Sequence, residues 1–284
     1  MKTSQPGPAQ PSATPDTAAL IAAASPPVGP LGAAFAVLRK HAPAVLTIAA
    51  LLLVWQGLVW SGRWSALYVV PPSAIVKSLR EMALNGELME NLSVSLYRIL
   101  AGFGVGAGIG LTLGLALGLS RLLDRMFSPI VAAIYPLPKL AILPLLVFWF
   151  GMGEGSKVAL IALGTFFYAC LNTYTGVRLV DPILIKAARN LAASRAQIVR
   201  TVILPGALPM TITGLKLAAG YSLALIVAAE MIAANTGLGH FVLLSGQFLQ
   251  TDRLMAGVVV FGILGILANL IMDLAERWLA PWRH

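Results

Sequence analysis

Six stretches of the chain are each apolar over about twenty residues, the length that an α-helix needs to cross the hydrocarbon core of a membrane. They cover residues 42–60, 96–119, 126–150, 157–177, 211–233 and 254–275. The chain is 58% hydrophobic and only 11% charged, whereas soluble domains usually carry about 25% charged residues. Too few charges remain to cover a soluble surface, so lipid must cover much of it. We therefore predict an all-α membrane protein with about six transmembrane helices.

The distribution of Lys and Arg predicts how the spans are oriented. With the N-terminus in the cytoplasm, twelve of the 20 Lys and Arg residues fall inside, six fall outside, and Lys139 and Lys216 fall within spans. An excess of positive charge on the cytoplasmic side is typical of membrane proteins, so both termini are predicted to be cytoplasmic. The same bias accounts for the net charge of +9 without a nucleic-acid partner, for which no zinc pattern or aromatic and basic platform is present.

The chain is predicted to divide into a tail and one membrane domain. Residues 1–40 are predicted to be a disordered cytoplasmic tail, because the first thirty are rich in Pro, Ala, Ser and Thr. Residues 41–284 form the transmembrane domain. Outside the membrane, residues 72–95 predict an amphipathic helix at the interface, and residues 235–252 predict a short re-entrant or interfacial helix. The single cysteine, Cys170, lies in an apolar run and is interpreted as a small packing residue.

Five glycines recur at every fourth position of the second span and therefore form one stripe on a helix. They are Gly102, Gly106, Gly110, Gly114 and Gly118. Small residues at this spacing let the backbone of another helix approach closely in lipid. The stripe predicts a tight seam within a bundle or a dimer, although it does not identify the helix that packs there.

The third span is rich in proline, with Pro129, Pro136, Pro138 and Pro144. Each proline removes a backbone donor and can kink or break a helix. Such breaks are tolerated at membrane depth where protein or a water-filled cavity surrounds them. Lys139 lies in the broken region, and a cation within a membrane is a candidate for function. The alternative is that Lys139 lies near the inner interface and extends its ammonium group to water.

The loop between the fourth and fifth spans predicts two short cytoplasmic helices. Asp181 is a suitable N-cap with Pro182 at the first helical position, so one helix should run to about Leu191. Ser194 and Gln197 match a capping box for a second helix, which is expected to end before Pro205. The loop carries apolar residues expected to bury on a protein partner, namely Ile183, Leu184, Leu191, Ile198, Val202 and Ile203. Docking of short amphipathic helices in a groove is a recurring mode of protein recognition, and it is favoured here over DNA binding.

This loop resembles the "EAA" loop of permease subunits of binding-protein-dependent ATP-binding-cassette importers. The family pattern is Glu-Ala-Ala, three residues, Gly, and about nine residues to Ile-x-Leu-Pro. Here Lys186 stands in place of the Glu, and Ala192 stands in place of the Gly. The residues at which the resemblance implies contact with an ATPase are Lys186, Ala187, Ala188, Leu191, Ala192, Ile198, Ile203, Leu204 and Pro205. They lie in residues 178–210, which we call the coupling loop.

The resemblance extends over roughly residues 45–283 and is greatest for the nitrate, sulfonate and taurine branch. It rests on the segments 136–144, 148–157, 172–177, 229–231 and 237–239. It implies a multi-pass permease of the bacterial inner membrane that works as a homodimer, or with a close relative. The partners implied are cytoplasmic ATPases, which bind ATP and Mg, and a periplasmic substrate-binding protein. This chain would itself need no catalytic residue, metal or cofactor, and it has no Gly-rich phosphate loop ending in Gly-Lys-Ser/Thr.

Four polar residues in or near the spans are candidates for the substrate pathway. Lys139 could attract an anion, Tyr135 and Asn172 could donate hydrogen bonds to its oxygens, and Glu230 argues against a uniformly cationic pore. Glu230 is either paired with Arg98 or solvated at the outer interface. A sulfonate or taurine is the first expectation for the substrate and nitrate the second. The competing interpretations are a secondary transporter or channel without ATP, and a membrane scaffold that binds a partner through the coupling loop.

Overall fold

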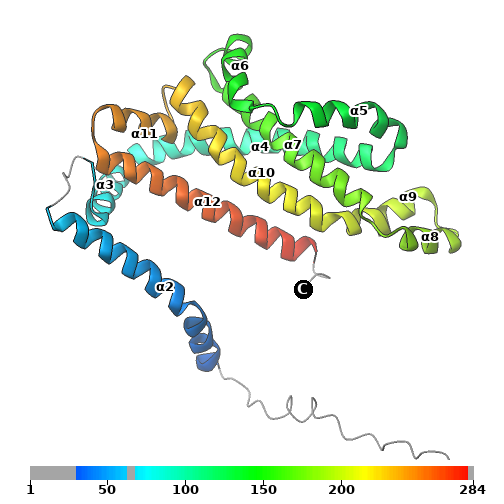
Figure 1. Ribbon diagram of the computed structural model, residues 1–284, viewed down its shortest axis with the longest axis horizontal. Coiled ribbons are helices and arrows are strands. Elements are labelled where there is room, and N and C mark those ends of the chain that lie inside the picture. The colour runs from blue at the N-terminus through cyan, green and yellow to red at the C-terminus, as the bar shows by residue number, and fades with distance from the viewer. Residues whose placement is uncertain (1–29, 63–67, 281–284) are drawn as a thin grey trace, which may run out of the picture. The chain divides into compact units, whose positions relative to one another are not determined.

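The computed structural model of the protein describes residues 30–62 and 68–280, and every regular element in those ranges is a helix (Figure 1). The chain forms two units, one ending at Gly57 and the other beginning at Leu58. The first unit contains most of α2 (Pro30–Trp60), whose residues Ala42–Trp60 are long and apolar enough to span a membrane.

The helix α2 begins inside the segment for which the sequence predicted a disordered tail. Residues 30–40 are helical, and Pro30 fits the first position of a helix because the amide that it lacks would have no partner there. Residues 1–29 of the predicted tail lie outside the described residues.

Four further helices of the second unit qualify as spans. They are α4 (Glu87–Leu119), α7 (Glu154–Arg178), the continuous helical segment Arg195–Ala233, and α12 (Thr251–Leu279). A fifth candidate is broken: α5 (Arg121–Ile134) is joined at 88° to η1 (Lys139–Ile142) and α6 (Leu143–Phe150). The described residues thus contain five spans, or six if the bent pair is one span, which confirms an all-α membrane protein with about six spans.

The break in the third span lies at its prolines. The chain leaves α5 at Tyr135 and passes through Pro136 and Pro138 before η1 begins at Lys139. Neither proline can donate to the helical hydrogen-bond ladder, so the predicted span of residues 126–150 consists of two helical pieces instead of one rod.

Two of the short helices outside the spans fall in the interfacial segments that the sequence predicts. The interfacial helix predicted for residues 72–95 is α3 (Pro72–Leu84), and it ends earlier than expected. Gly86 adopts a φ of +83° and turns the chain, so residues 87–95 belong to α4 instead. The second short helix, α11 (Leu238–Gln247), lies within the predicted segment 235–252.

The glycine stripe of α4 packs on α7, which the sequence did not identify as the partner. A methyl group built on Gly106 would lie 2.2 Å from the carbonyl oxygen of Ala162, and one on Gly114 would lie 2.4 Å from that of Cys170. The helix α7 also leaves no room for a methyl group at Gly102, Gly110 or Gly118. Cys170 is fully buried beside the stripe. The seam predicted from the glycine spacing is therefore a backbone-to-backbone contact between two helices of the same chain.

The helix α7 also contacts α10 (Leu204–Ala233), again through small residues. Gly176 of α7 approaches Ala207, and Gly214 of α10 approaches Asn172. A cluster of fully apolar side chains from α6, α7 and α10 fills the space between them, with Leu143, Leu146, Leu160, Ile161, Leu225, Ile226, Ala229 and Ala233 at its centre. Because α7 contacts both α4 and α10, it is the helix that holds the second unit together.

The prediction that a helix ends before Pro205 is wrong. After α8 (Pro182–Asn190), α9 (Arg195–Ile198) continues through a π-helical turn, η2 (Val199–Ile203), directly into α10. Within that turn the amide of Leu204 donates to Val199, five residues back. The wider turn accommodates the ring of Pro205, which cannot donate and would clash with the preceding turn of a regular α-helix.

The seam between α4 and α7 predicts a sharp difference between neighbouring glycines. Gly106→Ala is expected to lower the free energy of unfolding by about 1–3 kcal/mol, because the new methyl group has no room beside Ala162. Gly104→Ala is the matched control in the same helix, since a methyl group on Gly104 would meet nothing within 4 Å and alanine favours helix. Equilibrium unfolding of the purified chain in detergent micelles measures both, and equal losses would contradict the seam.

Candidate functional site

The coupling loop forms the helix–turn–helix that the sequence predicts. Asp181 caps α8 by accepting a hydrogen bond from the amide of Ile183 at 2.7 Å. The capping box is also present: the amide of Ser194 donates to Gln197 at 2.7 Å, and the amide of Gln197 donates to the Ser194 hydroxyl at 3.3 Å. Local side-chain chemistry therefore fixes both helix starts.

The turn between α8 and α9 places Ala192 in the left-handed conformation, with a φ of +57°. The amide of Ala193 donates to Ala188 at 3.1 Å, and the amide of Ala192 donates to Arg189 at 3.0 Å. This pair of bonds is the Schellman pattern, in which glycine usually occupies the left-handed position. The chain thus keeps the geometry of the glycine turn although it lacks the glycine.

The loop presents only part of its predicted contact surface. Leu191 is 83% exposed, and Ile183 and Leu184 are also exposed. By contrast, Ile198 and Ile203 are buried in a cluster with Val177 and Val180 of the same chain. The end of α7 thus covers most of both side chains in this structure, and their contact with a partner stays a prediction.

The remaining predicted residues of the loop lie at its surface or close to it. Lys186, Ala187 and Ala192 are exposed, as is Leu204, whereas Ala188 and Pro205 are half-buried. The surface of α8 that is open to a partner is formed chiefly by Ile183, Leu184 and Leu191. This surface can dock in an apolar groove of a partner protein.

The left-handed turn predicts that Ala192→Gly stabilises the coupling loop. Removing the side chain should relieve about 1 kcal/mol of backbone strain, which corresponds to about fivefold slower hydrogen exchange of the amides of α8. Ala187→Gly is the control of opposite sign, because it places glycine within α8 at an exposed position. Faster exchange in both variants would show that Ala192 is not strained.

A cavity of about 280 Å³ lies at the break in the third span. Its lining comes from the break itself, from the middle of α7 and from the middle of α10, and consists of Tyr135, Pro136, Leu137, Pro138, Lys139, Gly164, Phe167, Tyr168 and Tyr221. Three of these are tyrosines: the ring centroids of Tyr135 and Tyr168 are 6.2 Å apart, and those of Tyr168 and Tyr221 are 5.2 Å apart. We call this site the tyrosine cavity.

Lys139 is buried at the wall of the tyrosine cavity, so it does not extend its ammonium group to water. The ammonium donates to the carbonyl oxygens of Tyr135 and Ile134 at the end of α5, and it lies 4.5 Å from the centroid of the Phe167 ring. Lys216, the other cation predicted within a span, is neutralised by Asp273 and Glu276. Among the described residues, Lys139 has no carboxylate within ion-pair distance.

The other two predicted pathway residues do not line this cavity. The amide of Asn172 donates to the backbone of Tyr168 at 2.8 Å, one turn further along α7. Glu230 belongs to a separate buried network. Of the four predicted pathway residues, only Tyr135 and Lys139 line this cavity. Tyr168 and Tyr221 also line it but were not predicted, because they lie in ordinary apolar helical runs without a local motif.

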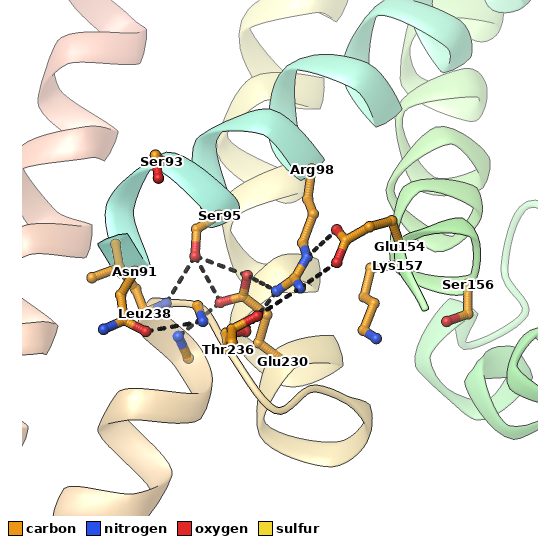
Figure 2. A network of polar contacts seen from close by, with 12 residues as sticks. Asn91, Ser93, Ser95, Arg98, Glu154, Ser156, Lys157, Glu230, Thr236 and Leu238 are labelled. Atoms are coloured by element: carbon orange, nitrogen blue, oxygen red, sulfur yellow. Dashed lines mark hydrogen bonds and ion pairs between the residues drawn. The ribbon is translucent and has the colours of Figure 1, made fainter. Parts of the chain in front are cut away.

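Glu230 is completely buried and is bound by donors from three directions, as Figure 2 shows. The guanidinium of Arg98 donates to it at 2.7 Å, the hydroxyl of Ser95 at 2.8 Å, and the amide of Gly239 at 2.8 Å. The pairing with Arg98 is therefore present, and the solvated alternative is excluded. Gly239 lies in the first turn of α11, where free amides and the helix dipole favour a carboxylate.

Arg98 joins three helices through this network. Besides Glu230 of α10, its guanidinium donates to both carboxylate oxygens of Glu154 at the start of α7, at 2.6 and 2.7 Å (Figure 2). It also donates to the backbone oxygen of Thr236 at 2.7 Å. Gly237 must be glycine, because its φ is +111° and a methyl group there would lie 2.4 Å from Glu230. The role of Glu154 was not predicted, since only the fold brings it to Arg98.

Removing one partner of this network should lower the stability of the fold. Arg98→Met leaves Glu230 buried without its cation, and the free energy of unfolding is expected to fall by about 3–5 kcal/mol. The double variant Arg98→Met/Glu230→Leu should be more stable than Arg98→Met alone, because no unpaired charge remains at the position of Glu230. Glu81→Gln, which breaks the exposed pair of Lys77 and Glu81, is the control and should change stability by less than about 0.5 kcal/mol. Similar losses for the exposed and buried pairs would contradict this account.

Comparison with known proteins identifies one family. Residues 106–284 match the family described as "Binding-protein-dependent transport system inner membrane component". The chain is 39% identical to the taurine transport system permease protein TauC of Escherichia coli (strain K12), over 86% of this chain and 90% of that protein. It is 37% identical to the putative aliphatic sulfonates transport permease protein SsuC of Bacillus subtilis (strain 168), over 84% and 87%.

The fold also has a counterpart among solved structures. A chain of an amino acid ABC transporter, crystallised with histidines, aligns with a TM-score of 0.59 at 19% identity. The alignment covers 70% of this chain and 97% of that chain. At this identity the likeness concerns the fold alone.

Proposed function

The chain belongs to the family of binding-protein-dependent transport system inner membrane components, and from that premise we propose that it carries a small sulfonate, first of all taurine, across the membrane. It is the permease component of an ATP-binding-cassette importer and a multi-pass protein of the bacterial inner membrane, not an enzyme. The observation that carries the substrate proposal is the tyrosine cavity, which joins a buried cation to three tyrosines.

The chemistry of the tyrosine cavity suits a zwitterion that carries a sulfonate group. Lys139, a buried ammonium with no carboxylate within ion-pair distance among the described residues, supplies the positive potential that an anion requires. The tyrosines bring hydroxyl groups that can donate to sulfonate oxygens and ring faces that attract an ammonium group. Taurine has both charges, whereas nitrate has no group for the ring faces. Nitrate is therefore the second candidate.

The position of the cavity supports a place on the substrate pathway. It is lined by residues from the middle of α7 and α10, beside the break between α5 and α6. Interrupted helices with exposed backbone groups are characteristic of binding sites at the membrane midplane. In this proposal, Asn172 and Glu230 are not contacts of the bound substrate, because neither lines the cavity.

The coupling loop is proposed as the attachment point of the ATPase. The family implies ATPase and binding-protein partners, and the exposed apolar surface of α8 suits a groove on such a partner. In this arrangement ATP and Mg bind to the ATPase, and a second copy of the chain completes the pathway. Movement of α8 would reach the tyrosine cavity through α7 and α10, which flank the loop.

Two variants separate transport from coupling. In proteoliposomes containing the assembled importer and its binding protein, Lys139→Gln should reduce taurine uptake at least tenfold while the ATPase remains bound, because Lys139 lies at the cavity and outside the coupling loop. Leu191→Asp should release the ATPase, because it places a charge on the exposed apolar surface of α8. Uptake of radiolabelled taurine and co-purification of the ATPase are the two measurements.

The controls assign each failure to one cause. Lys139→Arg keeps the charge and should retain more uptake than Lys139→Gln. Asn190→Gln changes an exposed residue of α8 outside both the apolar surface and the predicted ATPase contacts, and it should keep the ATPase bound. Undiminished taurine uptake by Lys139→Gln would refute the cavity as the substrate site. Inhibition of taurine uptake by nitrate but not by alkanesulfonates would instead favour nitrate as the substrate.

A further inference from the structure

A cleft of about 790 Å³ lies between the coupling loop and the ends of the helices that it joins. It is bounded by the end of α4, the start of α5, the end of α7, and the helices α8 and α9. Figure 1 shows α8 and α9 at one end of the second unit, away from α3 and α11. From α8 the cleft is lined by Pro182, Ile185 and Arg189. The exposed apolar residues Ile183, Leu184 and Leu191 do not line it.

Four arginines line this cleft, which we call the arginine cleft: Arg121, Arg178, Arg189 and Arg195. None of the lining residues is acidic. Arg178 forms an ion pair with Asp124, which lies just outside the lining. Within the described part of the chain, the other three arginines have no ion pair. Three positive charges are therefore gathered around one cavity without an ion-pair partner among the described residues.

The floor of the arginine cleft is apolar. It consists of Val177, Val180, Ile198 and Ile203, the cluster that buries the inner face of the coupling loop. Because these four side chains are at most 9% exposed, the part of the lining open to a ligand is the ring of arginines above an apolar floor. A ligand with an anionic head and an apolar body matches both parts of the lining.

The entrance beside α5 is suited to lipid. This helix begins at Arg121 and carries exposed apolar side chains, including Leu122, Met126 and Ile130. As the first half of the broken third span, α5 has its basic start at the level of the lipid headgroups and its exposed apolar side chains among the acyl chains. Acyl chains can therefore lie along α5 while a phosphate group reaches Arg121 at the mouth of the cleft.

We propose that the arginine cleft binds the headgroup of an anionic phospholipid from the membrane leaflet beside the coupling loop. Arginine forks bind phosphate oxygens through paired hydrogen bonds. Because Arg189 lies on α8 and Arg121 on α5, one headgroup phosphate would connect the coupling loop to the bundle and hold α8 in place for its partner. The inference concerns the lipid alone and does not depend on which solute crosses the membrane.

Native mass spectrometry of the full chain tests this proposal. The chain is released from micelles with phosphatidylglycerol or with phosphatidylcholine of the same acyl chains, and bound lipid is counted. Phosphatidylglycerol should be retained at least tenfold better. Each of Arg121→Gln and Arg189→Gln should weaken its binding by about fivefold, as expected for one basic residue at an anionic lipid surface. Arg189→Lys, which keeps the charge, should lose less than Arg189→Gln.

Two arginines outside the cleft are matched controls. Arg125→Gln on α5 and Arg200→Gln on η2 remove the same charge from the same end of the chain, and neither residue lines the cleft. Both should bind phosphatidylglycerol within twofold of the parent chain. Equal loss in the controls and the cleft variants would overturn the proposal, because it would show attraction by general surface charge.

Two further arms identify other occupants. Glycerol phosphate and inorganic phosphate are titrated against bound phosphatidylglycerol, and displacement at micromolar concentration would show a site for free phosphate rather than for lipid. In the assembled importer, if the cleft variants release the ATPase while phosphatidylglycerol binding is unchanged, the cleft holds an acidic segment of that partner. Either outcome would overturn the lipid proposal. Hydrogen exchange of α8 that slows only with phosphatidylglycerol, and only when Arg189 is present, would support it.

Discussion

The close approach of α4 and α7 is the contact on which the rest of the second unit depends. The stripe on α4 that begins with Arg98 continues through the glycines to Gly118, always four residues apart. At one end Arg98 reaches the carboxylates of α7 and α10, and at the other end Gly118 lies at the wall of the arginine cleft. A side chain larger than hydrogen anywhere between would separate the helices and displace both ends. One helix face therefore aligns the buried ion network with the coupling loop.

Two buried lysines of the described residues show how the chain satisfies backbone oxygens where helices end, one at the break in the third span and one at the turn between the third and fourth spans. Lys139 donates to the carbonyls that end α5, and Lys157 donates to Met152 and Gly153 in the turn after α6. Each ammonium thus satisfies backbone oxygens that a broken helix leaves without partners. For Lys139 this structural role and the proposed attraction of substrate are compatible, because its charge is not neutralised by a carboxylate among the described residues. The break in the third span therefore creates the tyrosine cavity, and Lys139 at the break gives it a positive electrostatic potential.

Much of the fold could be predicted from the sequence because membrane depth sets the length of each span and lipid sets its composition. The glycine spacing, the proline cluster and the capping box of Ser194 are local signals, and each formed the expected structure. Burial and pairing across helices were not predictable in this way. The sequence pattern around an apolar residue such as Ile198 does not distinguish burial by a partner from burial by its own chain. Similarly, Glu154 has no motif, and only the seam brings it to Arg98.

The central claim is that this chain forms a pathway for a small sulfonate whose opening is driven by ATP. The most direct test is taurine uptake by proteoliposomes that contain the purified importer, with the binding protein outside and ATP inside. The account predicts that taurine accumulates only when both are present, and that a non-hydrolysable ATP analogue abolishes accumulation. Uptake that needs neither ATP nor the binding protein, and that follows an ion gradient instead, would contradict the account and favour a secondary transporter.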